Sequence, residues 1–107
     1  MTTNKSKPIK AAALSLLARQ PYTTRRITEK LLQKGYGQHE TDDIIEWCTE
    51  EGYLNDTEWA VRAAELKARK GWDKYKISAY LRHYGIRRED VVNALDALEV
   101  TDEDDDV

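Results

Sequence analysis

The sequence predicts an all-α protein, built as a tandem repeat of two three-helix units in an elongated helical array. Composition gives the first reason. Only two prolines and five glycines interrupt the 107 residues, which favours helices over a turn-rich β fold. The second reason is an internal repeat, because a shift of 50 residues superimposes residues 9–36 on residues 59–86 without a gap. In addition, apolar residues recur at helical spacing between capping residues in both copies.

The repeat is carried by seven identities in 28 aligned positions, against roughly two expected by chance from ordinary composition. Beyond Gly35 an offset of 47 pairs Ile44 and Ile45 with Val91 and Val92, which predicts a loop three residues longer in the first copy. The identical pairs are Ala13/Ala63, Leu16/Leu66, Ala18/Ala68, Arg19/Arg69, Ile27/Ile77, Leu31/Leu81 and Gly35/Gly85.

In the first copy, three helices are bounded by recognisable start and stop signals. Pro8 suits a first helical turn, and Pro21 stops the first helix. Thr23 or Thr24 caps a second helix that ends at Gly35, and a third helix follows the polar loop. The inward-facing apolar positions are expected to be Ile9, Ala13, Leu16, Leu17, Ile27, Leu31, Ile44, Ile45 and Cys48.

The second copy repeats these signals. Asn55 is a candidate cap for its first helix, which ends at Gly71, and Asp73 caps the second helix, which runs to Gly85. We expect Trp59 at the junction of the copies. The inward-facing positions are predicted to be Trp59, Ala63, Leu66, Ile77, Leu81, Tyr84, Val91, Leu95 and Leu98.

These signals divide the chain into four segments. Residues 1–8 form an N-terminal arm, residues 9–53 the first three-helix repeat and residues 54–99 the second. Residues 100–107, which include five carboxylates, are predicted to be a disordered acidic tail because they are highly charged and have few apolar residues to bury.

The charges are arranged in blocks. Residues 1–36 and residues 62–88 each carry a net charge of +7, whereas residues 37–58 carry −8. Such blocks are compatible with ordinary solvated helix faces. Two basic blocks of equal density also fit an anionic partner, and the sequence leaves both interpretations open.

Several function classes find no support in the sequence. Cys48 is the single cysteine, so no disulfide forms within the chain, and His39 and His83 are too far apart in sequence to suggest a zinc site. The longest apolar run, residues 11–14, is far shorter than a membrane span. No catalytic motif is present. We therefore expect a cytoplasmic protein that is not an enzyme and has no metal, cofactor, small-molecule ligand or membrane partner.

A candidate partner-binding face comes from the middle helix of each copy, turned at about 100° per residue. With Ile77 at 0°, Arg82 and Tyr75 fall near 140° and 160°, opposite the predicted buried stripe, and the equivalent helix of the first copy also turns cations outward. The predicted binding residues are Arg25, Arg26, Lys70, Lys74, Tyr75, Lys76, Arg82, His83, Arg87 and Arg88.

The junction between the copies carries a family resemblance. Residues 52–60 read GYLNDTEWA and resemble the GYL-D-D-x-x-[FW]-A signature of the RecX family of bacterial recombination regulators. Arg69-Lys70-Gly71, the run Ile77-x-x-x-Leu81-x-x-x-Gly85-Ile86 and the opening Ala13-Leu14-x-Leu16-Leu17-Ala18-Arg19 are similar to that family's sequences too. The resemblance covers roughly residues 9–98.

The resemblance implies a regulator that binds in the groove of the RecA–DNA filament. It implies inhibition of strand exchange, ATP hydrolysis and co-protease activity in DNA repair and recombination. Members of the family usually carry a third three-helix repeat, so this chain resembles a short, two-repeat form. The residues themselves leave a different class open, in which the basic helices bind nucleic acid directly as helix-turn-helix modules do.

Overall fold

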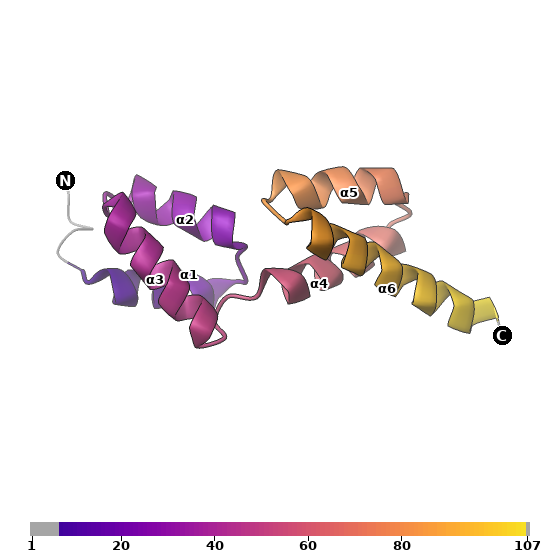
Figure 1. The fold of residues 1–107 in the computed structure, drawn as a ribbon, viewed down its shortest axis with the longest axis horizontal. Helices are drawn as coiled ribbons and strands as arrows, with labels where there is room; N and C mark the ends of the chain where they lie inside the picture. Colours follow the sequence, from indigo (N-terminus) through magenta and orange to yellow (C-terminus); the bar gives the residue numbers. More distant parts are fainter. Residues whose placement is uncertain (1–6, 107) are drawn as a thin grey trace. The chain divides into compact units, whose positions relative to one another are not determined.

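The computed structural model describes the backbone of residues 7–106 and the side chains of residues 7–98. Most of the predicted N-terminal arm, residues 1–6, lies outside the described residues. Within the described part the secondary structure is helical, without a strand, which confirms the all-α fold class. Figure 1 shows the helices, which are α1 (Ile9–Arg19), α2 (Thr24–Gln33), α3 (Gln38–Glu50), α4 (Asp56–Arg69), α5 (Lys74–His83) and α6 (Arg88–Asp106).

The chain divides into two compact units, Met1–Asn55 and Asp56–Val107. We call them the first and the second unit, and each holds three helices and its own hydrophobic core. The division falls two residues beyond the boundary expected from the sequence. The buried core of the first unit consists of Ala12, Ala13, Leu16, Ile27, Leu31, Tyr36, Ile44, Cys48 and Leu54.

The predicted helix signals operate in both units. The Thr23 hydroxyl accepts a hydrogen bond from the Arg26 N–H at 3.3 Å, and the Asp73 carboxylate accepts one from the Lys76 N–H at 2.8 Å. These side chains replace partners that the first turns of α2 and α5 lack. Gly35 ends the turn after α2 at a φ of 102°, a left-handed conformation that favours glycine.

The second unit is built around close packing of α4 against α6, the most extensive helix pair in the structure. Ala60, Ala64 and Ala94 are completely buried there, and their small side chains let the two helices approach. At one end of this pair the Thr57 hydroxyl donates a hydrogen bond to the Asp90 carboxylate at 3.0 Å. Asp90 is only 6% exposed, and a buried carboxylate needs hydrogen-bond partners. The bond from Thr57 supplies one, and it also links the starts of α4 and α6.

The repeat keeps an offset of 50 through its third helix, which corrects the predicted change to 47. Helix α3 begins at Gln38 and α6 at Arg88. Burial follows the same register, because Thr41 is buried where Val91 is, and Ile44 where Ala94 is. A comparison of apolar residues alone could not find this correspondence, because the core position of Val91 is occupied by the polar residue Thr41 in the first unit. The two units therefore have turns of equal length between their second and third helices.

The face of α4 also differs from the prediction. Leu66 is 56% exposed, whereas its repeat partner Leu16 is 8% exposed and belongs to the first core. In the second unit, Ala60 and Ala64 occupy the contact with α6 instead. Because α4 turns this alanine face inward, Leu66 is left on the outer side of the helix.

The segment predicted to be an acidic tail begins within helix α6. Helix α6 continues from Arg88 to Asp106. Adding a residue to a helix that packing has already formed costs less than nucleating a new one, because each added residue gains a backbone hydrogen bond.

Two further features concern the described residues. Trp59, expected at the junction, packs against the core of the second unit and stacks on Tyr80 with ring centroids 6.4 Å apart. None of the described helices combines the length and apolar character that a membrane crossing requires.

Candidate partner-binding surface

The predicted binding residues lie in both units. Arg25 and Arg26 are on α2 of the first unit. The other eight belong to the second unit, where all are exposed. Lys70 follows the end of α4, α5 carries Lys74, Tyr75, Lys76, Arg82 and His83, and Arg87 and Arg88 lie at the start of α6.

Several of these cations already have partners within their own unit. Arg26 pairs with Glu29 at 2.8 Å, and Arg87 pairs with Glu89 at 2.9 Å and with Asp90 at 3.6 Å. The Lys76 ammonium lies 4.3 Å from the ring centroid of Trp72, in a cation–π contact. Arg26 and Arg87 are therefore already paired with carboxylates of their own unit.

The remaining charge is concentrated in fewer residues. Lys70, Arg82 and Arg88 have neither an ion pair nor a ring contact among the side chains that the structure describes. Tyr75 is 89% exposed on the same helix as Arg82. We call these four residues, Lys70, Tyr75, Arg82 and Arg88, the α5 surface. They combine available cations with an exposed aromatic ring, a combination suited to a partner that carries carboxylates or phosphates.

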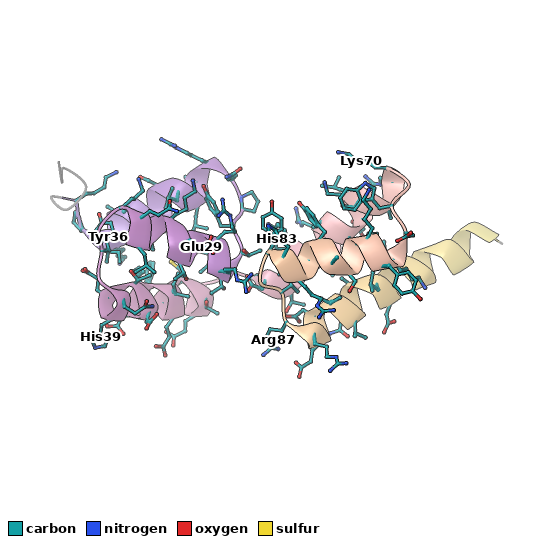
Figure 2. The ribbon with its side chains drawn as sticks, turned by 90° about the horizontal axis from the view of Figure 1, so that it is seen from above. Glu29, Tyr36, His39, Lys70, His83 and Arg87 are labelled. Carbon is teal, nitrogen blue, oxygen red and sulfur yellow. The ribbon has the colours of Figure 1, made fainter. Side chains whose placement is uncertain are left out.

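The basic residues of the second unit extend around α5 and do not form one compact patch. Figure 2 shows Lys70 and Arg87 at opposite edges of the unit, with α5 between them and His83 at one end of that helix.

Sequence reasoning missed an aromatic cluster beside this surface. The cluster consists of Trp59, Trp72, Tyr80 and Tyr84, whose rings touch in pairs with centroids 4.9–6.4 Å apart. The Lys67 ammonium lies 4.8 Å from the ring centroid of Trp72 and 4.7 Å from that of Tyr80. Burial, together with the neighbouring Tyr84 hydroxyl, raises the pKa of Tyr80. The spacing of Tyr80 and Tyr84, four residues apart on one helix face, was the available signal.

Catalytic and metal-binding chemistry has no recognisable centre in the described residues. No group of three or more His, Cys, Asp or Glu side chains gathers there to hold a metal ion. Cys48 is buried in the first core as a free thiol, and burial raises its pKa.

Comparison with known proteins identifies the family. The model for the first three-helix domain of RecX matches residues 10–48, which contain α1, α2 and most of α3. The chain is 28% identical over 95 residues to Regulatory protein RecX of Halorhodospira halophila, covering 89% of this chain and 59% of that protein. These matches support membership of the RecX family.

Other relatives agree with this assignment. Over 87 residues, or 81% of this chain, the identity is 29% to Regulatory protein RecX of Pseudomonas savastanoi pv. phaseolicola and 30% to that of Pseudomonas syringae pv. tomato. The chain covers 56% of each of these two proteins, so it spans little more than half the length of its relatives. The matched family is thus one of proteins named as regulators.

Proposed function

We propose that this chain regulates the RecA recombinase by binding the RecA–DNA filament, and that it inhibits the filament's strand exchange, ATP hydrolysis and co-protease activity. Membership of the RecX family supports this proposal, since the matched relatives carry the name Regulatory protein RecX. On this proposal the chain is a cytoplasmic regulator of DNA repair and is not an enzyme.

The α5 surface is the proposed contact. Arg82 and Arg88 present guanidinium groups that no described carboxylate neutralises, so a partner's carboxylates or phosphates can pair with them. Tyr75 can bury most of its ring on binding, because almost all of it is exposed. Ring burial together with charged contacts is typical of residues that dominate binding energy at interfaces.

Filament binding can be measured by labelling this chain and titrating it with RecA assembled on single-stranded DNA. The charge-reversed variant Arg82→Glu/Arg88→Glu should bind at least about tenfold more weakly, because each lost charge-assisted contact is worth about 1.5–3 kcal/mol when desolvated. Arg62→Glu/Arg69→Glu makes the same charge change on exposed residues of α4 and serves as the matched control.

The binding experiment has clear contrary outcomes. Equal binding by wild type and by folded Arg82→Glu/Arg88→Glu would remove the α5 surface from the interaction. Absence of binding by wild type under all nucleotide conditions would contradict the RecA proposal itself.

Direct binding of nucleic acid is the second candidate function. Tyr75 favours it, because an exposed aromatic ring near unpaired arginines can stack on a base while the arginines hold the backbone. Salt dependence separates the two functions. Neutralised phosphates make the logarithm of affinity fall steeply and linearly with the logarithm of salt concentration when the chain is titrated with DNA alone.

A further inference from the structure

The first unit contains a small cavity that the sequence did not predict. Its volume is about 120 Å³, against about 300–1,000 Å³ for pockets that hold a drug-sized ligand. This cavity can therefore admit one chemical group and cannot enclose a whole nucleotide. The residues that line it are Lys7, Ala12, Ser15, Leu16, Arg19, Lys34 and Tyr36.

The polar lining of the cavity is strongly cationic. Lys7, Arg19 and Lys34 supply three positive charges, and no carboxylate is among the lining residues. None of these three cations has an ion pair with any side chain that the structure describes. Ser15 adds a hydroxyl that can donate a hydrogen bond. The group that this lining suits is therefore a small anion.

The backbone around the cavity holds these side chains in place. The Tyr36 hydroxyl donates a hydrogen bond of 2.7 Å to the carbonyl oxygen of Lys7 (Figure 2 labels Tyr36). This bond holds the backbone of Lys7 close to Tyr36, which follows α2. Lys34 is the C-terminal cap of α2, and its N–H is bonded to carbonyls of the last turn. Buried Ala12, Leu16 and Tyr36 provide an apolar floor. The cationic lining is thus attached to ordered elements.

We propose that this cavity binds a phosphate group. A phosphate carries up to two negative charges and several acceptor oxygens, so it can pair with Lys7, Arg19 and Lys34 together. A single carboxylate has two oxygens and would balance only one of the three positive charges. The sequence had predicted no small-molecule ligand, and the cavity is the reason to revise that expectation.

The repeat supplies an internal comparison. At the offset of 50, Thr57 replaces Lys7, Glu65 replaces Ser15 and Tyr84 replaces Lys34, while Arg69 retains the charge of Arg19. The second unit has therefore lost two of the three cations and gained a carboxylate that would repel a phosphate. Phosphate binding is a property proposed for the first unit alone, and it does not depend on the RecA proposal.

A nuclear magnetic resonance titration of the full chain with inorganic phosphate, at constant ionic strength maintained with chloride, tests this site. Backbone signals of residues near the cavity should shift and saturate, while those of the second unit should not. Lys34→Tyr and Ser15→Glu, which introduce the second unit's residues, should each raise the dissociation constant at least about tenfold, the loss expected for one charge-assisted contact. Arg69→Tyr, the same charge change on an exposed residue of the second unit outside the α5 surface, should leave it unchanged.

Three outcomes would overturn the proposal. They are the absence of saturable shifts around the cavity, wild-type affinity in folded Lys34→Tyr, and equal weakening by Lys34→Tyr and Arg69→Tyr. The last result would show that phosphate responds only to net charge. Circular dichroism of each variant checks that the helices are retained.

The source of the phosphate group can be found with the same signals. A short oligonucleotide carrying a 5′-phosphate and its unphosphorylated form should shift the same residues. Stronger binding of the phosphorylated form identifies a terminal phosphate, equal binding identifies a backbone phosphate, and binding of inorganic phosphate alone identifies the free ion. All three sources support the proposed site.

Discussion

The two units share the order of their helices, the helix caps and the turn glycines, and they differ in how their side chains pack. Equivalent side chains cap α2 and α5, namely Thr23 and Asp73, and equivalent glycines, Gly35 and Gly85, end the turns that follow. The contacts built on this plan have diverged. In the second unit, α4 packs closely on α6 through alanines, and an aromatic cluster packs beside them. In the first unit, Leu16 belongs to the core and also lines a cationic cavity.

This difference shows which sequence signals fix structure locally and which depend on neighbours. Caps and turn glycines act on their own helix, so they survive divergence between the copies. The inward face of a helix depends on the size of the residues opposite it. The same leucine is therefore core in one unit and surface in the other.

The largest expected effect tests the leucine pair directly. Leu16→Ala should lower the free energy of unfolding by about 2–5 kcal/mol, because it removes buried methyl groups and leaves a cavity. Leu66→Ala should change it by less than about 0.5 kcal/mol, as is usual for an exposed position. Urea denaturation followed by far-ultraviolet circular dichroism measures both variants. Equal losses would show that Leu66 is buried and that the first helices of the two units pack alike.

A smaller effect concerns Thr41, which stands where the second unit has Val91. Thr41 is fully buried, and its hydroxyl has no hydrogen-bond partner among the described residues. Thr41→Val should therefore stabilise the protein by about 1 kcal/mol or more, because an unsatisfied buried hydroxyl costs about 1–3 kcal/mol.

Thr23 provides the matched control for this substitution. It is equally buried, but its hydroxyl caps α2, so Thr23→Val should destabilise the protein by about 0.5–2 kcal/mol. Thermal unfolding measures both changes on one scale. A loss of stability in Thr41→Val would show that the Thr41 hydroxyl has a hydrogen-bond partner in the folded protein.

The smallest expected effect concerns the rate at which Cys48, in the first unit, reacts with an alkylating reagent. Cys48 is buried there, and its repeat partner is Leu98. Since a thiol must be exposed and ionised to react, and burial raises the pKa of Cys48, alkylation should be much slower in the native protein than in urea. The native rate should also rise with pH above the range where an ordinary thiol ionises. A native rate equal to the rate in urea would show that the first core is open.

The sequence predicts most of the fold because its strongest signals are local. Pro8, Thr23, Asp73 and the turn glycines mark the helix boundaries without reference to tertiary contacts. The register of the third helices could not be predicted from apolar identities, since Thr41 occupies a core position through its shape despite its hydroxyl.

The candidate site was predictable only in part. A helical wheel places Arg82 and Tyr75 on the outer side of α5, and the structure finds both exposed. The wheel contains no information on neighbouring elements. It could not show that Lys76 rests on Trp72 from the preceding loop, or that Arg87 pairs with residues of α6. The cavity of the first unit joins residues along α1 with Lys34 and Tyr36, which follow α2, and sequence periodicity does not connect these segments.

The most direct test of the proposed function exchanges the two units' residues at the α5 surface. At the offset of 50 the first unit carries Gln20, Leu32 and Gln38 where the second carries Lys70, Arg82 and Arg88. The variant Lys70→Gln/Arg82→Leu/Arg88→Gln should therefore lose most of its inhibition of RecA-dependent ATP hydrolysis on single-stranded DNA, with its helicity unchanged. Full inhibition by this folded variant would contradict the claim that the α5 surface of the second unit carries the regulation.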